Sequence, residues 1–261
     1  MRLPRALTLA ASALAFAATS ACAQRGDGMS VSRETFDGAE WIVARADMHR
    51  VRLRMLSAGG AIGSYRQAED ALRRRGERML LATNGGLFDG GPIGLHVEDG
   101  RVVRALNLDT VPPAGQKPGN FYYLPNAVLY QDRAGNVAIR DARRMHGRES
   151  SVRDGTQSGP ALLLDGAVHR VARPPNRGVA HRNRLAACVT GPRELVIVFA
   201  RQPTTFPQLA RFLAGLGCRD AVFLDANVPG IYVPGERIDV APQSFAGILT
   251  LTVPSDDAAR P

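Results

Sequence analysis

The residues best suited to chemistry stand together after a short apolar run. Residues 78–82 have the character of a buried strand, and the chain continues as Thr83-Asn84-Gly85-Gly86-Leu87-Phe88-Asp89. Gly85 and Gly86 let the backbone adopt positive φ and approach a ligand closely, while Asn84 and Asp89 supply an amide and a carboxylate on either side. This stretch predicts a backbone cradle flanked by polar groups. The alternative is an ordinary glycine turn, because short motifs often arise by chance.

A second acidic residue follows another buried strand. The apolar run Ala221-Val222-Phe223-Leu224 ends at Asp225, which repeats the arrangement around Asn84 and Asp89. The alternative role for Asp225 is to cap a turn. Ser158 stands in Gln157-Ser158-Gly159-Pro160, but no Gly-x-Ser-x-Gly is present, so we do not expect a hydrolase triad built on this serine.

Short strands separated by turns must position these groups. Strand patterns lie at 41–44, 51–56, 78–82, 93–97, 101–103, 121–124, 127–130, 137–139, 161–164, 185–190, 195–200, 221–224 and 248–253. Two helices are predicted, one over 65–75 after the cap residue Ser64 and one over 205–216, ended by Gly217. A short arginine-rich helix is expected from Asp141 to about residue 149. We see no linker or repeat that would split the chain into two domains.

The charge balance points to anionic partners. The formal net charge is +9, or +7 without Arg2 and Arg5. This charge favours phosphate-bearing glycans or an envelope surface. Nucleic acid is disfavoured, because the arginines are scattered and no aromatic-basic binding motif is present. The alternative is that arginine simply replaces lysine on a solvated surface.

The first 23 residues have the pattern of an export signal. Arg2 and Arg5 precede an apolar stretch at 6–18 that is too short to span a bilayer comfortably, and Ala21-Cys22-Ala23 is a cleavage site. We expect a mature domain at 24–261 with an ordered core at about 32–253, a mobile start at 24–31 and no transmembrane segment. The protein is then periplasmic or secreted. A second interpretation makes Cys22 a lipid-anchored first residue, although Thr19 stands where such signals usually carry leucine.

If the protein is exported, its remaining cysteines lie in an oxidising compartment. Cys188 and Cys218 form an even pair in an oxidising compartment once Cys22 is removed with the signal, and a disulfide between them is plausible. The alternative is two buried thiols that act as small hydrophobic residues. No Cys/His spacing indicates zinc.

The order of motifs along the chain resembles the phosphodiester glycosidase family, typified by the mannose-6-phosphate uncovering enzyme, and in particular its compact bacterial exported members. The resemblance covers most of the mature chain and rests on short motifs in a shared order. These motifs are Asn84-Gly85-Gly86-Leu87-Phe88-Asp89, Pro92-Ile93-Gly94-Leu95 with Glu98-Asp99-Gly100, Gly119-Asn120-Phe121, Gln157-Ser158-Gly159-Pro160, Arg182-Asn183, and Leu216-Gly217-Cys218 with Leu224-Asp225.

The resemblance implies a fold and an activity. The fold is α+β, a single domain with a mixed, largely antiparallel β-sheet and a few flanking helices. The activity is hydrolysis of the bond between a sugar's anomeric carbon and a phosphodiester, which releases the sugar and a phosphomonoester.

The resemblance also implies roles for individual residues. Asp89 and Asp225 become the candidate catalytic carboxylates, and Arg182 becomes the best clamp for phosphate oxygens. The other candidate substrate-binding residues are Asn84, Gly85, Gly86, Asn120, Ser158, Asn183 and Asn227.

One departure from the family pattern affects the site. Family members usually continue after Leu-Asp with glycine and serines, whereas Asp225 is followed here by Ala226-Asn227-Val228-Pro229-Gly230. Pro229 has no backbone N–H to donate to a phosphate. Asn227 compensates, the substrate differs, or activity is lost. The alternative function is therefore a non-catalytic envelope protein that binds an anionic or phosphorylated glycan.

We predict no cofactor. The oxygen groups of Asp89, Asp225 and the neighbouring asparagines suit a divalent cation such as calcium, but no loop with recognised calcium spacing is present.

Overall fold

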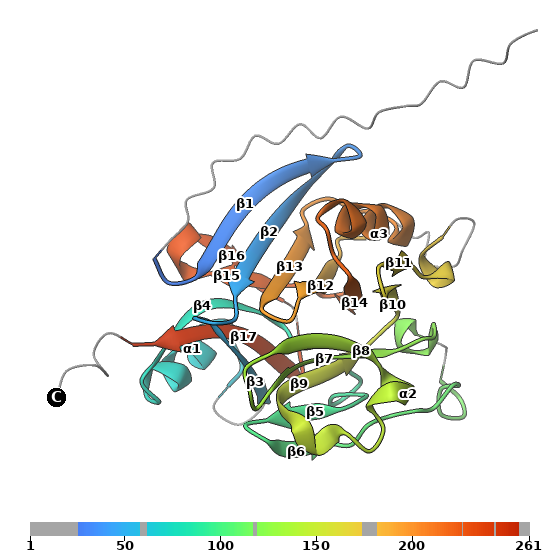
Figure 1. Ribbon diagram of the computed structural model, residues 1–261, viewed down its shortest axis with the longest axis horizontal. Coiled ribbons are helices and arrows are strands. Elements are labelled where there is room, and N and C mark those ends of the chain that lie inside the picture. Colours follow the sequence, from blue (N-terminus) through green and yellow to red (C-terminus); the bar gives the residue numbers. More distant parts are fainter. Residues whose placement is uncertain are drawn as a thin grey trace, which may run out of the picture.

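The computed structural model describes residues 26–57, 62–116, 119–173, 182–225, 227–242 and 244–255. The predicted export signal, Cys22 and Ala226 lie outside these residues. The described strands form three sheets, here named sheets I, II and III (Figure 1). Every strand pair in them is antiparallel. The fold is mainly β with some helices. The expected largely antiparallel character is confirmed, but the described strands contain no parallel pair and form three sheets rather than one.

Sheet I has seven strands and lies in the upper part of Figure 1. In spatial order they are β1 (Met29–Phe36), β2 (Ala39–Asp47), β13 (Glu194–Ala200), β12 (Leu185–Gly191), β14 (Asp220–Asp225), β10 (Ala161–Leu164) and β11 (Ala167–Val168).

Sheets II and III have five strands each. Sheet II runs β16 (Ile238–Val240), β15 (Ile231–Val233), β4 (Glu77–Asn84), β17 (Gly247–Pro254) and β3 (Arg52–Ser57). Sheet III runs β6 (Arg101–Arg104), β5 (His96–Glu98), β9 (Val152–Ser158), β7 (Ala127–Asp132) and β8 (Val137–Asp141).

Short helices cover the outer faces of the sheets (Figure 1). They are α1 (Tyr65–Arg73), α2 (Ala142–Met145) and α3 (Phe206–Gly215), with 3-10 turns at Asn120–Tyr122, Glu149–Ser151, Arg170–Ala172 and Pro234–Glu236. Ser64 caps α1, as the sequence predicts, by accepting the N–H of Gln67. Helix α2 is shorter than expected and ends at Met145. None of the helices in the described ranges is long and apolar enough to cross a bilayer.

Two local expectations are wrong. The mobile start was placed at 24–31, but β1 begins at Met29 and pairs with β2, so sheet I gains an edge strand. Because most residues of β1 are polar or charged, the sequence shows no apolar alternation there.

Residues 121–124 are expected to form a strand, but the 3-10 turn Asn120–Tyr122 occupies this place. The turn makes a hydrogen bond within its own backbone, in which the N–H of Tyr123 donates to the carbonyl of Asn120.

The three sheets share one apolar core. Side chains from all three are buried together, among them Ile42 and Ile197 of sheet I, Leu81 and Leu249 of sheet II, and Leu129 of sheet III. Burying this surface provides the main favourable free energy of folding. The shared core also brings the ends of strands from different sheets close together.

Helix α3 packs on the outer face of sheet I through an aromatic cluster. Phe206, Leu209, Phe212 and Leu213 are buried and spaced for one helix face. The ring of Phe212 stacks on Trp41 of β2 with 4.4 Å between centroids. Thr205 and Gln208 form a capping box that fixes where the helix begins.

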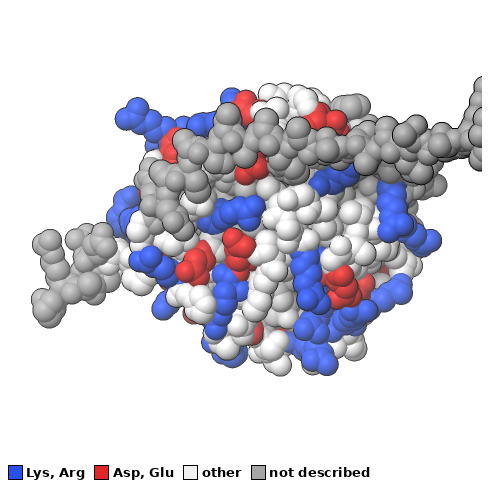
Figure 2. Space-filling view, turned by 45° about the horizontal axis from the view of Figure 1, so that its top comes forward, with Lys and Arg blue, Asp and Glu red and all other residues white. Residues whose placement is uncertain are grey.

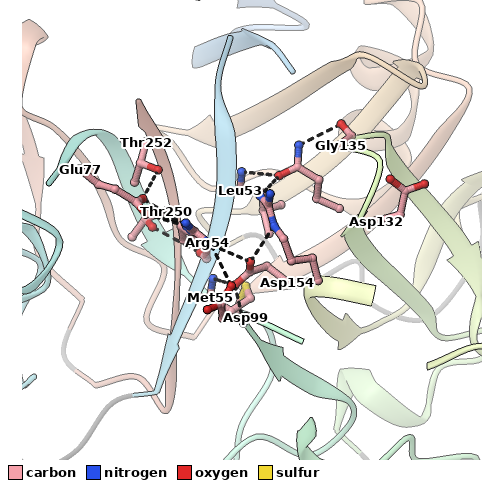
Figure 3. A network of polar contacts seen from close by, with 12 residues as sticks. Leu53, Arg54, Met55, Glu77, Asp99, Asp132, Gly135, Asp154, Thr250 and Thr252 are labelled. Carbon is pink, nitrogen blue, oxygen red and sulfur yellow. Dashed lines mark hydrogen bonds and ion pairs between the residues drawn. The ribbon is translucent and has the colours of Figure 1, made fainter. Parts of the chain in front are cut away.

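A network of charged groups joins sheets II and III (Figure 3). Arg54 of β3 forms an ion pair with Glu77 of β4 at 2.6 Å, and a longer one with Asp154 of β9 at 3.5 Å. Asp154 is buried, and its Oδ1 accepts the backbone N–H groups of Met55 and Asp99. Burial raises the pKa of Asp154 despite these donors. Burial also acts to raise the pKa of Glu77, but hydrogen bonds from Arg54 and Thr252 outweigh it and leave that pKa lowered.

The Cys188–Cys218 disulfide expected from the sequence is present, with 5.7 Å between the Cα atoms. It joins the middle of β12 to Cys218, which lies between α3 and β14. Cys188 is also the strand partner of Ala221 in β14. The bond therefore secures the strand that leads to Asp225.

Glu77→Gln should destabilise the protein, because it leaves Arg54 partly buried without its closest anion. We expect the free energy of unfolding at pH 7 to fall by about 3 kcal/mol, measured by urea denaturation. Since the folded-state pKa of Glu77 is lowered, its contribution is present above the unfolded pKa and is lost as the pH falls through the folded pKa. The difference between wild type and variant should therefore shrink in acid.

The control is Asp70→Asn, which removes an exposed pair with Arg73 and should cost less than about 0.5 kcal/mol. Equal losses in the two variants would contradict this role of the network.

Removing the disulfide should also lower stability. The bond closes a loop with a sequence separation of 30 residues. Chain entropy then predicts that the double variant Cys188→Ala/Cys218→Ala loses about 3.5 kcal/mol of unfolding free energy. Wild type treated with reductant should show the same denaturation midpoint as the double variant. An unchanged midpoint after complete reduction would show that the disulfide contributes nothing to stability.

Candidate active site

Asn84 and Asp225 meet where sheets I and II come together. Asn84 is the last residue of β4, and Asp225 is the last residue of β14. The side-chain amide nitrogen of Asn84 donates to Asp225 Oδ2 at 2.9 Å. Both residues are buried, Asn84 fully and Asp225 to within 2% of its surface. The two strand-end groups that the sequence singled out are thus in direct contact.

The amide of Asn84 makes four hydrogen bonds inside the protein. Its Nδ2 also donates to the carbonyl of Val228 at 3.2 Å. Its Oδ1 accepts the backbone N–H of Gly230 at 2.7 Å and the hydroxyl of Tyr65 at 3.1 Å. Burial and the charge of Asp225 raise the pKa of Tyr65, which keeps this hydroxyl protonated as a donor. These bonds use the full donor and acceptor capacity of the amide.

Asp225 is held from both of its oxygens. Its Oδ1 accepts the backbone N–H of Asn227 at 2.8 Å and lies 3.4 Å from the N–H of Val228, while Oδ2 accepts from Asn84. Donors of this kind stabilise the charged form of a carboxylate and fix its orientation. The carboxylate is therefore placed by the turn that follows its own strand.

The glycines after Asn84 allow three strands to approach closely. The N–H of Gly85 donates to the carbonyl of Gly247 at 2.8 Å, and its own carbonyl accepts the hydroxyl of Thr156. A Cβ at Gly85 would lie 2.8 Å from the backbone of Gly247. Gly86 has φ +104°, and a Cβ there would lie 2.8 Å from Thr156 Oγ1. The Gly85 amide is thus committed to the protein. Close packing accounts for the glycine at Gly85, and close packing together with the positive φ accounts for it at Gly86.

Ser158 lies at the same junction. It is the last residue of β9, is fully buried, and its Oγ accepts the N–H of Leu87 at 3.3 Å. Two residues later, the carbonyl of Pro160 accepts the N–H of Phe223, which precedes Asp225 by two positions in β14. Ser158 therefore ties the glycine-containing loop to the segment that runs beside β14.

A shallow groove brings three other predicted residues together. Arg182, Asn183 and Asn227 line a cleft of about 390 Å³ together with Val228 and Pro229. Asn227 and Val228 are the residues whose N–H groups face Asp225 Oδ1, so the carboxylate lies directly behind this wall. Arg182 is exposed, and Asn183 donates to the carbonyl of Arg201 at 3.1 Å.

The other predicted carboxylate has different neighbours. Asp89 is exposed, and its N–H closes a turn onto the carbonyl of Gly91. Burial raises the pKa of Tyr122, and the charges of Asp109 and Asp89 add to this. Asn120 begins the 3-10 turn that carries Tyr122. That Asp89 and Asn120 share one site with Asp225 stays a prediction.

Two residues near Asp225 were not among the sequence candidates. Tyr65 is expected in the core from its place on the helix face, but its hydroxyl binds Asn84.

Arg184 precedes Leu185, the strand partner of Asp225, and is buried, with 2% of its surface exposed. Its Nε donates to the carbonyl of Thr204 at 2.8 Å, and its guanidinium lies 4.0 Å from the centre of the Phe206 ring. Burial lowers the pKa of Arg184 to about 10, so it stays charged at neutral pH. The sequence signal that could have pointed to Arg184 is a charged residue directly before an apolar strand.

Basic charge is distributed over the surface. Figure 2 shows Lys and Arg side chains interspersed with Asp and Glu on the face in view. Several exposed arginines form ion pairs, such as Arg201 with Glu40 at 2.7 Å and Arg211 with Asp37 at 2.6 Å. Among the described residues, no group of three or more His, Cys, Asp and Glu side chains is arranged to hold a metal ion.

Comparisons with known proteins identify the family of the chain. The phosphodiester glycosidase family profile matches residues 77–226, from the start of β4 to just past Asp225. The fold is similar to that of the catalytic domain of zebrafish N-acetylglucosamine-1-phosphodiester alpha-N-acetylglucosaminidase, solved in a form auto-inhibited by its pro-peptide. The TM-score is 0.59 with 14% sequence identity, over 85% of this chain and 81% of the zebrafish chain. A search of curated proteins gave no match. Since the profile covers more than half of the sequence, the chain belongs to the phosphodiester glycosidase family, whose members are hydrolases.

Proposed function

We propose that the protein is an exported hydrolase that cleaves the glycosidic bond of a sugar-1-phosphodiester. The products are the free sugar and a phosphomonoester. The observation that carries this proposal is the buried Asp225 carboxylate, which Asn84 holds at 2.9 Å behind a groove lined by Arg182. A fixed carboxylate next to an exposed guanidinium suits a substrate with an anomeric carbon and a phosphate on neighbouring atoms.

The residues divide into two kinds of role. Arg182 binds the phosphate oxygens, since its planar fork can donate to two of them at once. Asn183 and Asn227 line the same groove and bind phosphate or sugar hydroxyls. Asn84 acts through Asp225, because its own amide has no hydrogen-bonding capacity left for substrate. Gly85, Gly86 and Ser158 hold the junction in shape.

Asp225 acts as base or as nucleophile. As base it takes a proton from the water that adds to the anomeric carbon while the bond to the phosphate oxygen breaks. As nucleophile it bonds to that carbon first, and water then breaks the bond to Asp225. In both routes the phosphomonoester leaves with the bonding electrons. Phosphate is a better leaving group than an alcohol, so this reaction needs less help from an acid than ordinary glycoside hydrolysis does. We assign any acid role to Asp89, which lies on the neighbouring loop.

Export follows from the signal-like first 23 residues, and a disulfide is typical of proteins in an oxidising compartment. The second candidate function is a non-catalytic envelope protein that binds an anionic glycan. The altered loop from Ala226 to Gly230 favours that candidate, because Pro229 removes a backbone donor next to the groove.

Asp225→Asn should abolish most of the turnover. The mature protein, starting at Gln24, is incubated with a panel of sugar-1-phosphodiesters and the release of reducing sugar is followed. Loss of the reacting carboxylate should lower kcat by about a hundredfold to ten-thousandfold, with much of the substrate binding retained. Asp165→Asn, which changes a carboxylate that is 64% exposed, is the matched control and should keep full activity. If well-folded wild type releases no sugar from any substrate but binds the panel, the glycan-binding alternative is correct.

Asn84→Asp should shift the pH profile of the reaction. The new carboxylate keeps an acceptor for Gly230 and Tyr65 but faces Asp225 Oδ2, where Asn84 donates over 2.9 Å. Two carboxylates at this distance cannot both ionise readily, so the pair should bind a proton at higher pH. We expect the acidic limb of kcat/KM to move up by about one pH unit or more. An unchanged limb with lower activity would mean that Asn84 has only a structural role.

A further inference from the structure

A second cavity, of about 330 Å³, lies beside the segment that carries Ser158. Its walls come from the loop at 107–110, residues 124–126, residues 141–143 at the start of α2, and Leu164, His169 and Arg170. Cavities of this size hold small organic ligands. Gly159 joins the cavity to the candidate site, since a Cβ there would lie 2.1 Å from Oδ1 of Asn126, a residue of the cavity wall.

Asn126 separates the cavity from the segment that carries Ser158. Its backbone is fixed, with its carbonyl accepting the N–H of Ala142 at 2.9 Å. The residue is 4% exposed, and its side-chain Oδ1 is buried against Gly159, without a hydrogen-bond partner among the described residues. This oxygen therefore belongs to the wall itself, and the ligand contacts must come from other side chains of the lining.

Two more polar side chains line the cavity. Asp141 accepts the N–H of Arg143 with Oδ1 at 2.8 Å, and its Oδ2 has no bond within the described ranges. His169 accepts the N–H of Val171 with Nδ1 at 3.3 Å, which leaves Nε2 as the protonated donor of the neutral ring. Burial, Arg170 and Arg173 lower the pKa of His169, against the opposing charge of Asp141, and keep the ring neutral.

The remaining walls combine apolar surface with balanced charge. Leu108, Leu124 and Leu164 line the cavity and give it an apolar wall. The charged lining consists of Asp109 and Asp141 against Arg143 and Arg170. A neutral ligand leaves this balance intact, whereas a phosphate would add uncompensated negative charge.

We propose that this cavity is a sugar subsite that binds a neutral pyranose ring. The C–H face of the ring packs on the leucine side chains, while its hydroxyls bond to Asp141 and His169. The inference rests on the proposed function for one point, that the bound ring is a sugar unit of the hydrolysed glycan.

The test uses the mature chain with a panel of methyl pyranosides, titrated by calorimetry and by NMR, and with glucose 6-phosphate as the anionic probe. Thr110→Trp places a bulky ring at an exposed wall position of the cavity. Val111→Trp adds the same ring at the next residue, which is 68% exposed and does not line the cavity. We expect Thr110→Trp to weaken binding of the best pyranoside by about tenfold or more, and Val111→Trp by less than about twofold.

A second pair of variants tests the polar contacts. Asp141→Asn keeps an oxygen to cap α2 but removes the charge-assisted bond to a sugar hydroxyl, which should weaken binding by about threefold to tenfold. Asp165→Asn should leave binding unchanged. Absence of pyranoside binding by folded wild type, equal binding in Thr110→Trp, or clear preference for glucose 6-phosphate would each overturn the inference.

Sugar-release kinetics separate this inference from the proposed function. If wild type releases sugar and Thr110→Trp leaves KM unchanged, the subsite is wrong and the hydrolase function stands. If no phosphodiester is cleaved but pyranoside binding is lost in Thr110→Trp, the cavity is a sugar site and the hydrolase function is wrong.

Discussion

The side-chain amide of Asn84 is the contact on which the candidate site depends. It lies at the end of β4 in sheet II, yet it bonds to the last residue of β14 in sheet I and to the turn that leads into β15. One carboxamide thus sets the relative position of two sheets and the conformation of the loop between them. In a low-dielectric interior such a saturated amide is stabilising, whereas a single missing partner would leave a buried polar group unpaired.

Three other features hold in place the strands that carry this contact. The shared core of the three sheets fixes the strands, the Arg54 network fixes sheet II against sheet III, and the disulfide fixes β12, the partner of β14. Each support acts on a different neighbour of the junction. The carboxylate of Asp225 is therefore held by rigid elements on one side and by the turn at Asn227 and Val228, which lines the groove, on the other.

Much of this arrangement follows from local sequence patterns. Asn84 and Asp225 could be singled out because each ends a buried apolar run, and α1 begins directly after the predicted cap Ser64. Helix α3 lies within the predicted range 205–216. Partition into three sheets could not be foreseen, since it depends on which strands pair over long sequence distances, as β4 does with β17. Tyr65 and Arg184 look like a core aromatic and a loop cation until folding brings them to Asn84 and Phe206. Strands of three residues, such as β15 and β16, are too short to show a period.

The glycines at the junction also limit which substitutions this protein can accept. A single methyl group would collide at Gly85 with Gly247, at Gly86 with Thr156 and at Gly159 with Asn126. These positions can tolerate almost no mutational drift, so the frame around Asp225 is closed to gradual change. Variation in ligand preference is left to exposed residues on the surrounding loops, such as Leu108, Arg182 and Asn227. Evolution can therefore retune what the protein recognises without disturbing the frame that holds its carboxylate.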